Sequence, residues 1–301
     1  MAKSSNLDIV KISKETGGYI ASNSSIFENI SINSSSREIL KESVTGTPLI
    51  RLGESNSNNS NSNNSNSNNS NFNNSNSNSN NSNFNNSNSN SNNSTFDSNS
   101  STNSSDGHRV MIIAGVHGNE LPPQIAAIHL IDRLKNIELN GEVYVIPFLA
   151  PKATMDNSRW FDGADLNRIT SHYGSITNNI LNIAKDLNLD SVGDFHSTGP
   201  NSVPGKESIF CAMNPSPESY DIANYIAETI NSEIIFYPVA GQRYQGTIED
   251  ECNLRGIPSI TCEVFSENGH ADKKSYMRSL TQMLSYLAYF GIISDNFEKF
   301  L

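Results

Sequence analysis

Residues 110–135 read VMIIAGVHGNELPPQIAAIHLIDRLK, an apolar run followed by a polar turn and a periodic apolar segment. The run predicts a buried strand over residues 109–114, and the second part predicts a helix through about Lys135. Pro122 and Pro123 stand in the first turn of that helix, where a missing N–H is tolerated. Strand and helix patterns then alternate along the chain. This alternation predicts an α/β fold.

The further predicted elements follow the same alternation. Strands are expected at residues 142–148, 191–195, 208–212, 233–237 and 259–264. Helices are expected at residues 176–187, 217–230 and 273–289. The long connection before residue 176 has no predicted helix or strand, so we expect it to be a loop.

Two histidines and one glutamate follow the ends of apolar runs. His117 and Glu120 lie in GVHGNE, and His196 ends the run in GDFHST, 76 residues after Glu120 (196 − 120). Side chains three apart in a strand-to-helix turn can converge, and three such ligands at about 2.0 to 2.2 Å suit zinc with a fourth position open for water. Both strands are expected to end at one rim of the sheet. Asp194, on the same strand face as His196, is either a partner for that histidine or an ordinary strand-end carboxylate.

In these segments the chain resembles the zinc carboxypeptidase superfamily and, within it, the succinylglutamate desuccinylase and aspartoacylase deacylases. The matching motifs are GVHGNE, Arg159 with the DLNR segment at residues 165–168, DFHST, and GIPSITCEV. The resemblance covers about residues 46–287, apart from the Asn- and Ser-rich insert described below. The resemblance implies a mixed β-sheet flanked by helices and one zinc ion held by His117, Glu120 and His196. Zinc lowers the pKa of its bound water to roughly 7 and polarises a carbonyl, so it supports amide hydrolysis.

Two catalytic residues are implied by the same resemblance. Glu263 matches the general base, which takes a proton from the zinc-bound water and passes it to the leaving amine. Strand alternation places Glu263 on one face with Thr261, and a carboxylate in an otherwise apolar strand is costly to bury without a role. Arg159 matches the arginine that stabilises the oxyanion. The alternatives are a strand-end carboxylate in water and a surface arginine in the short string SRW.

Three substrate contacts are also implied by the resemblance. Asn167 and Arg168 match the pair that binds a substrate carboxylate, for which the planar guanidinium fork is suited. Tyr244 stands shortly before a Gly-Thr-Ile turn, where carboxypeptidases carry a mobile tyrosine that lines the specificity pocket. If this match holds, Tyr244 contacts substrate and Glu249 lies near the side-chain pocket.

The N-terminal third of the chain has a different composition. Residues 55–94 are Asn and Ser apart from Phe72 and Phe84, too polar to offset the entropy of ordering. We expect a disordered insert over residues 55–105 within a catalytic domain at 46–301, after a lead-in segment at 1–45 with a helix at 36–43. A glycan-bearing tract and an aggregation-prone tract remain alternatives for the insert. The insert separates two strand-like runs, 47–52 and 108–114, which we expect to pair as a hairpin across a long loop.

Charge and cysteine content narrow the class of protein. The formal net charge is −11 and no basic cluster occurs, which argues against a nucleic-acid partner. No apolar run is long enough to span a membrane, and the N-terminus lacks a signal pattern. Cys211, Cys252 and Cys262 are too few for a disulfide framework and indicate a reducing compartment. These features predict a cytoplasmic location and leave the oligomeric state open.

The pattern predicts a zinc-dependent hydrolase of the deacylase type that cleaves an amide bond adjacent to a carboxylate. Its partner is expected to be a small acyl-amino acid or a peptide with a free carboxylate. A metallo-carboxypeptidase or a cell-wall peptide amidase would use the same residues. Only 38 residues follow Glu263 (301 − 263), whereas desuccinylases and aspartoacylases carry a further β-rich domain, so the ending looks more like a carboxypeptidase or a minimal deacylase.

Two other classes of protein are alternatives. A serine hydrolase has little support, because Ser197 beside His196 lies in no GxSxG motif. A non-catalytic protein that binds a metal or a carboxylate needs neither Glu263 nor Arg159. The presence of both residues beside the ligands therefore favours an enzyme.

Overall fold

The computed structural model describes residues 37–39, 47–53 and 107–301. The expectations for the insert at 55–105 and for most of the lead-in segment lie outside these residues. The described strands are β1 (Arg37–Ile39), β2 (Pro48–Leu52), β3 (His108–Ala114), β4 (Gly141–Ile146), β5 (Ser191–Thr198), β6 (Ser208–Asn214), β7 (Glu233–Val239) and β8 (Ser259–Phe265). The described helices are α3 (Leu121–Leu134), α4 (Pro151–Met155), α5 (Ile176–Asp186), α6 (Glu218–Ile230), α7 (Ile248–Asn253) and α8 (Lys273–Tyr289), with 3-10 turns at Leu166–Arg168 and Glu298–Phe300.

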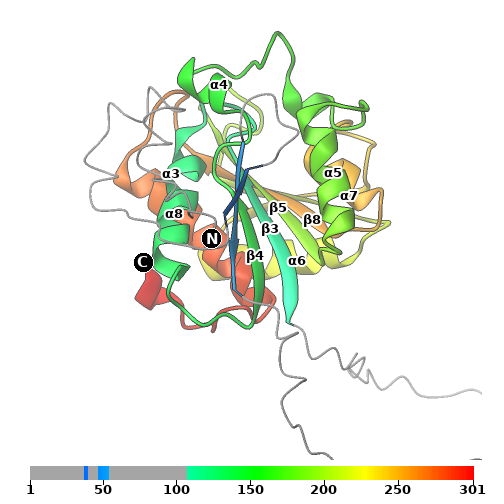
Figure 1. Cartoon of the computed structure of the whole chain (residues 1–301). Coiled ribbons are helices and arrows are strands. Elements are labelled where there is room, and N and C mark those ends of the chain that lie inside the picture. The colour runs from blue at the N-terminus through cyan, green and yellow to red at the C-terminus, as the bar shows by residue number, and fades with distance from the viewer. Residues whose placement is uncertain (1–36, 40–46, 54–106) are drawn as a thin grey trace, which may run out of the picture. The chain divides into compact units, whose positions relative to one another are not determined.

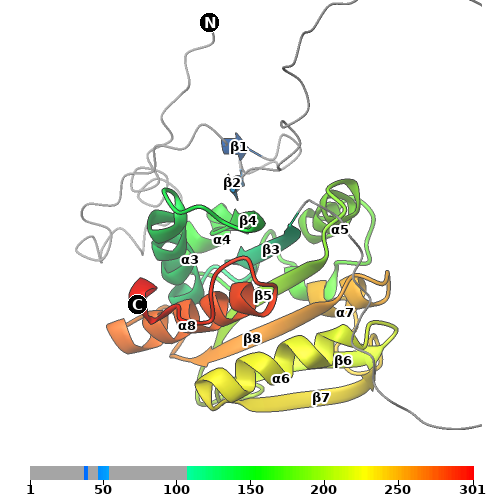
Figure 2. The same cartoon turned by 90° about the horizontal axis from the view of Figure 1, so that it is seen from below.

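The described residues form one mixed sheet, whose central strands are labelled in Figure 1 and whose strand order, β1-β2-β4-β3-β5-β8-β6-β7, can be followed in Figure 2. β4, β3, β5 and β8 run parallel, whereas β2 pairs antiparallel with β4 and β6 pairs antiparallel with β8. The prediction of an α/β fold with a mixed sheet flanked by helices is therefore confirmed. Because the four central strands are parallel, their carboxyl ends meet at one edge of the sheet.

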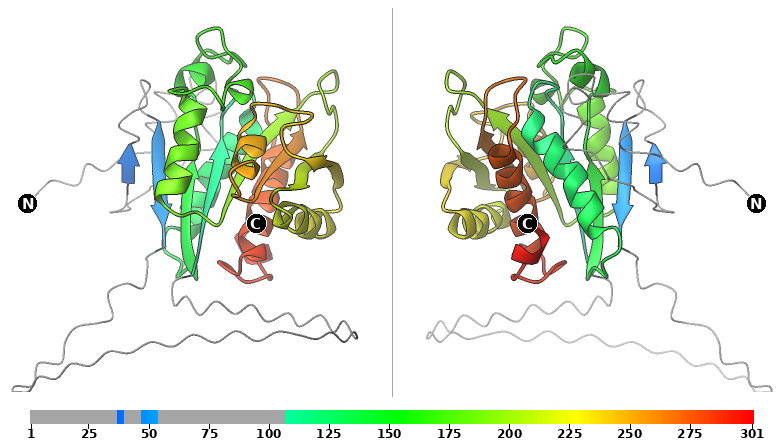
Figure 3. Two further views of the ribbon diagram at one scale, coloured as in Figure 1. Left: turned by 90° about the vertical axis from the view of Figure 1, so that its right-hand side faces the viewer. Right: turned by 90° about the vertical axis from the view of Figure 1, so that its left-hand side faces the viewer.

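Helices cover both faces of the sheet, as Figures 2 and 3 show. On one face, α3, α6 and α8 pack against the sheet around buried residues such as Ile112, Phe195 and Cys262. On the other face, α4, α5 and α7 enclose a second core that includes Met111 and Ile113. Neighbouring residues of β3 thus enter opposite cores, as expected for a parallel strand that is buried on both sides. Among the described residues, no helix is long and apolar enough to cross a membrane.

The predicted hairpin between residues 47–52 and 108–114 is wrong. β2 pairs with β4, with Ile50 opposite Val145, and β4 lies between β2 and β3. The connection from β3 through α3 returns the chain beside β3, as a parallel crossover does. The crossover places β4 beside β3, in the position where β2 was expected to pair with β3.

The predicted helix at residues 36–43 is also wrong over its described part. Residues 37–39 form β1, which pairs antiparallel with β2 so that Glu38 lies opposite Leu49. An isolated segment this short has too little helix-forming free energy of its own, and an available sheet edge offers backbone hydrogen bonds instead.

Candidate active site

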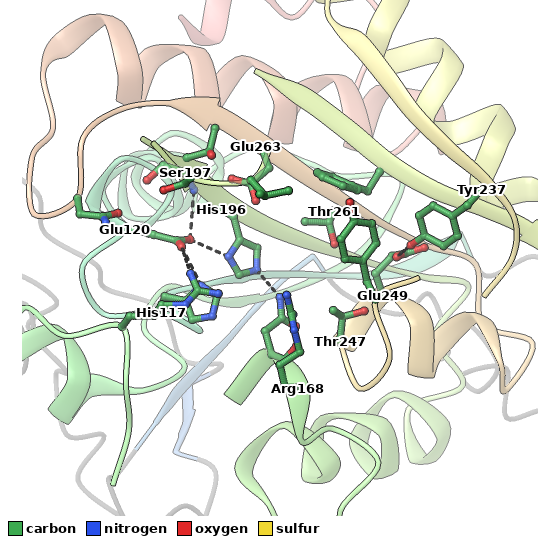
Figure 4. Close-up of a pocket in the computed structure, with 18 residues that line it drawn as sticks. His117, Glu120, Arg168, His196, Ser197, Tyr237, Thr247, Glu249, Thr261 and Glu263 are labelled. Carbon is green, nitrogen blue, oxygen red and sulfur yellow. Dashed lines mark hydrogen bonds and ion pairs between the residues drawn. The ribbon is translucent and has the colours of Figure 1, made fainter. Parts of the chain in front are cut away.

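The three predicted metal ligands converge at the carboxyl ends of β3 and β5. Nδ1 of His117 lies 2.8 Å from Oε1 of Glu120, and Nδ1 of His196 lies 2.7 Å from Oε2 of the same carboxylate. One ligand atom from each residue lies within 4.8 Å of the others, and all three side chains are buried. Figure 4 shows the two imidazoles directed at Glu120. The expectation that two separate strands deliver these residues to one rim is confirmed.

The outer nitrogens of both imidazoles face carboxylates. Nε2 of His117 lies 2.9 Å from Oδ1 of Asp165, and Nε2 of His196 lies 2.9 Å from Oδ2 of Asp194. With a proton on each Nε2, the two Nδ1 lone pairs would be available to a cation held beside Glu120, the arrangement typical of metal-binding histidines. The donor set of two imidazoles and one carboxylate fits zinc.

The charges of this group are strongly coupled. Burial alone would raise the pKa of Glu120, but the two imidazoles lower it far below its usual value. Burial alone would lower the pKa of His196, but Asp194 and Glu120 outweigh it and hold that pKa well above its usual value. Glu120 is therefore a carboxylate, and a divalent cation between the ligands would take the place of a proton.

The tight turn between the two ligands of GVHGNE depends on Gly118. A Cβ on Gly118 would lie 2.0 Å from the backbone carbonyl carbon of Ala153, so only glycine allows α4 to approach so closely. Gln124, fully buried in α3, donates to the backbone carbonyls of Gly118 at 3.2 Å and Glu120 at 2.8 Å. These contacts fix the turn that presents both ligands.

Arg159 lies beside the ligands. Its Nη1 donates to Oε1 of Glu120 at 3.3 Å, and its Nε and Nη2 donate to Oδ2 of Asp165 at 3.2 and 3.0 Å. Asp165 therefore bridges His117 and Arg159 through its two oxygens. The side chain of Arg159 remains 37% exposed, so the guanidinium borders the open part of the pocket.

Glu263 lies on β8 directly opposite His196 on β5 and faces the same pocket. Thr261 shares this face, whereas Ile260 and Cys262 enter the core beneath α3 and α8, so the predicted alternation is confirmed. Oε2 of Glu263 is buried and has no hydrogen-bond partner among the described residues. Burial, together with the charges of Glu120 and Asp194, raises the pKa of Glu263 to about 8.

Asn167 and Arg168 both line the pocket, but they are held differently. The side-chain oxygen of Asn167 accepts from the backbone N–H of Ile248 at 3.0 Å, and its amide nitrogen lies 3.3 Å from Nε2 of His196. Among the described residues, Arg168 donates only through Nη1, to the backbone carbonyl of Asn167 at 2.6 Å. Arg168 thus has donors left for a substrate, whereas the Asn167 side chain is occupied by protein groups.

Tyr244 lies in the lining of the same pocket, with Glu249 nearby. The turn after it approaches the DLNR segment closely, since a Cβ on Gly246 would lie 2.2 Å from the backbone oxygen of Arg168. The Gly246 φ of +78° also favours glycine. This contact brings residues 244–249 into the pocket beside Arg168.

Several residues that line the pocket or contact the three predicted ligands were not predicted from the sequence as members of the site. Asp165 and Gln124 hold the ligands, and Phe210, Tyr237 and Thr261 line the pocket. Asp165 was detectable as the first residue of DLNR, at the end of an arginine-bearing loop. The pocket residues on β6 and β7 carry no local motif, because their neighbours in space are distant in sequence.

The family assignment follows from the comparison with known proteins. Residues 106–289 match the succinylglutamate desuccinylase/aspartoacylase catalytic domain. The match covers more than half of the chain, so the chain belongs to this family, as the four motifs predicted. No significant match is found among curated proteins.

Solved structures with the same fold include three informative relatives. A succinylglutamate desuccinylase/aspartoacylase from Rhodobacter sphaeroides is 21% identical with a TM-score of 0.51, covering 63% of this chain and 57% of that one. The product-bound ectoine utilization protein EutE (DoeB) from Ruegeria pomeroyi is 16% identical, with a TM-score of 0.52 and coverages of 62% and 59%. The tripeptide-bound cell shape determinant Csd4 from Helicobacter pylori is 16% identical, with a TM-score of 0.51 and coverages of 62% and 52%. The chain spans less than two thirds of the length of each.

Proposed function

We propose that this protein is a zinc-dependent hydrolase of the deacylase type, which cleaves an amide bond adjacent to a carboxylate. The observation that carries the proposal is the buried convergence of His117, Glu120 and His196 beside Glu263 in one pocket. Membership in the desuccinylase/aspartoacylase family supports it. A protein that only bound a metal would not need Glu263 and Arg159 to face the same space.

The metal would be held by Nδ1 of His117, Nδ1 of His196 and the Glu120 carboxylate. When bound, zinc supplies a Lewis acid that polarises a carbonyl and lowers the pKa of water to about 7. Asp165 would keep the imidazole of His117 in the tautomer that this role requires, and Oδ2 of Asp194 lies 2.9 Å from Nε2 of His196.

Glu263 is proposed as the general base. Its carboxylate accepts a proton from the water that attacks the amide carbon and delivers that proton to the nitrogen of the leaving amine. The products are a carboxylic acid and an amine, so one water is consumed for each amide bond broken. The raised pKa of Glu263, about 8, would fall when a cation occupies the adjacent ligands, because positive charge stabilises the carboxylate.

Arg159 and Arg168 are proposed to bind two different groups of the substrate: the carbonyl oxygen that becomes negative during the reaction, and the substrate carboxylate. Arg159, which is oriented by two bonds to Asp165, stabilises the oxygen that becomes negative when water adds to the carbonyl. Arg168 pairs with the substrate carboxylate, since in the described part of the chain only its Nη1 donates to a protein group. Asn167 and Tyr244 border this carboxylate site.

A peptide C-terminus is the second candidate substrate. The pocket continues past Arg168 to Tyr237 and Glu249, so it has space for a side chain beyond the carboxylate. The relative Csd4, which shares the fold, was solved with a tripeptide. A carboxypeptidase or a cell-wall peptide amidase would use the same ligands and the same base.

The test compares the wild-type protein with Glu263→Gln after loading with Zn²⁺. We expect one bound zinc per chain in both proteins by elemental analysis, and hydrolysis of acyl-amino acids by the wild type. In Glu263→Gln, kcat should fall by about 10² to 10⁴. Exposed Glu267, just after β8, provides the matched control, and Glu267→Gln should keep full activity.

The substrate panel consists of N-acetylaspartate, succinylglutamate and short peptides. Hydrolysis of peptides alone would replace the deacylase assignment with the peptidase one. Full activity in Glu263→Gln would remove the general base, and a wild-type protein that binds no zinc would remove the proposed function altogether.

A further inference from the structure

The pocket extends across the sheet from the metal ligands to a second end. The ligands come from β3 and β5, Glu263 and Thr261 from β8, Phe210 from β6, and Tyr237 from β7, in the order of the strands in the sheet. The register places Thr261 between Asp194 and Phe210 on neighbouring strands. In Figure 4 the histidines and Glu120 lie at one end, and Tyr237, Glu249 and Thr247 lie at the other.

Aromatic rings form the walls of this second end. The ring of Tyr244 lies 5.2 Å from that of Phe210 and 5.8 Å from that of Tyr237, both at steep angles. All three residues line the pocket. Aromatic faces carry partial negative charge, so they attract a cation and pack well against an alkyl chain.

A buried carboxyl group lies at this end. Glu249 lines the pocket but is only 1% exposed. Its Oε1 accepts from Nδ2 of Asn253 at 2.7 Å, and its Oε2 accepts from the hydroxyl of Tyr237. Among the described residues it forms no ion pair with an arginine or lysine. Asp250 and Asp194 add negative charge that acts on Glu249, whereas Arg243 lies over the ring of Tyr244, with Cζ 5.3 Å from the ring centroid.

Burial and the charge of Asp250 raise the pKa of Glu249 to about 8. A buried carboxyl group with a raised pKa lacks a neighbouring counter-ion. A positively charged ligand would supply one and stabilise the carboxylate form, whose two oxygens accept from Asn253 and Tyr237.

Thr261 contributes a polar group to this end of the pocket. Its side chain lines the pocket and the residue is 6% exposed. Its hydroxyl is not among the buried polar atoms that lack a hydrogen-bond partner in the part of the chain that the structure describes, so it is accessible from the pocket. A hydroxyl can donate and accept, so it can bond with a group that enters the pocket.

We propose that this second end binds the positively charged side chain of the substrate, a primary ammonium at the end of an alkyl chain. This inference rests on the proposed function, because Arg168 would hold the carboxylate of the same amine half. The substrate is then an N-acylated basic amino acid or a peptide that ends in one. Aromatic walls receive the alkyl chain, Glu249 pairs with the ammonium, and Thr261 accepts a hydrogen bond from it. An acidic side chain would meet Glu249 and be repelled.

Binding of the amine product tests the inference without any turnover. Calorimetry on the zinc-loaded protein would compare L-lysine with L-norleucine, which has the same alkyl chain without the ammonium, and with L-glutamate. We expect L-lysine to bind at least about tenfold more tightly than L-norleucine, as a buried charged hydrogen bond implies. L-glutamate should bind most weakly.

Glu249→Gln should reduce the ratio of the L-norleucine and L-lysine dissociation constants to near one. Thr261→Val should reduce this ratio less. The Thr261→Val variant still provides a test if Glu249→Gln does not fold. Glu251, on the same helix but paired with Arg255 outside the pocket lining, gives the control Glu251→Gln, whose ratio should equal that of the wild type.

Equal affinities for L-lysine and L-norleucine, or preference for L-glutamate, would overturn the inference. An unchanged ratio in a folded Glu249→Gln variant would do the same. Absence of hydrolysis on every acyl-amino acid and peptide would contradict the proposed function, while these affinities would still decide the chemistry of the second end.

Discussion

The two ends of the pocket are built in different ways. At the metal end, His117 and His196 share Glu120 and each has its own carboxylate partner on the outer nitrogen. At the other end, Glu249 has hydrogen-bond donors but no described cation. The first end has three side chains arranged to bind one small ion. The second end has aromatic side chains and a buried carboxyl group, which would contact a larger ligand group. Under the proposed function, this contrast would place reaction chemistry and substrate selection in separate parts of one pocket.

Removal of a ligand should have the largest effect and should separate the two ends. We expect His196→Ala to lose bound zinc and all measurable turnover, since only two protein ligands remain. Binding of L-lysine should remain detectable, because the second end does not contain His196. Elemental analysis, a turnover assay and calorimetry on the same preparation measure the three quantities. Loss of L-lysine binding in a folded variant would show that the two ends are not independent.

Replacement of Arg159 tests whether a residue beside the metal ligands, and not only the ligands themselves, contributes to the rate of hydrolysis. We expect Arg159→Gln to keep zinc and to lower kcat by about 10² to 10³, as removal of an oxyanion-stabilising group does. Arg255, a similarly exposed arginine paired with Glu251, is the control, and Arg255→Gln should retain activity. An increase in KM with unchanged kcat would instead assign Arg159 to substrate binding.

Asp165 tests the carboxylates behind the ligands. Asp165→Asn should weaken zinc binding by about 10- to 100-fold, because it removes the charged partner of the His117 outer nitrogen. Competition with a chelator measures this change, and Asp162→Asn in the exposed part of the same loop is the control. Unaltered zinc affinity would mean that Glu120 alone orients His117.

The opposite edge of the sheet should show the smallest effect. His108 at the start of β3 pairs with Asp190, with Nδ1 and Oδ2 3.2 Å apart. The bond to Asp190 raises the pKa of His108; burial alone would raise the pKa of Asp190, but His108 and the N–H of Arg109 lower it. The contribution of His108 to the free energy of unfolding is complete below about pH 6.5 and is lost as pH rises through the pKa of His108 in the folded protein. The contribution of Asp190 is complete above about pH 4 and is lost as pH falls through the pKa of Asp190 in the folded protein.

We therefore expect His108→Gln to lower the free energy of unfolding by less than about 1 kcal/mol, because the pair is half exposed. The difference from wild type should be greatest between about pH 4 and 6.5 and should disappear at higher pH. Denaturant unfolding across this range measures it. Reduced turnover in His108→Gln would contradict the expectation that this edge of the sheet does not affect the active site.

Local patterns predicted much of the fold. The strand β3, the helix α3 and the long helix α8 follow from apolar runs, prolines and periodicity, and their observed bounds agree with prediction to within one or two residues. The neighbours of β2 were not predictable in this way. Pairing of β2 with β4 depends on the crossover through α3, and any strand with a suitable apolar face could have taken that place.

For the site, the sequence by itself determined the metal end. His117, Glu120 and His196 stand at strand ends, and parallel strands bring their carboxyl ends to one rim, so local pattern was sufficient. Only the tertiary structure decided the second end. Alternation tells which face a residue of β6, β7 or β8 occupies, but it does not tell which strand lies beside it. Phe210, Tyr237 and Glu249 meet because the strand order and the approach of Gly246 to Arg168 bring them together, through contacts between residues distant in sequence.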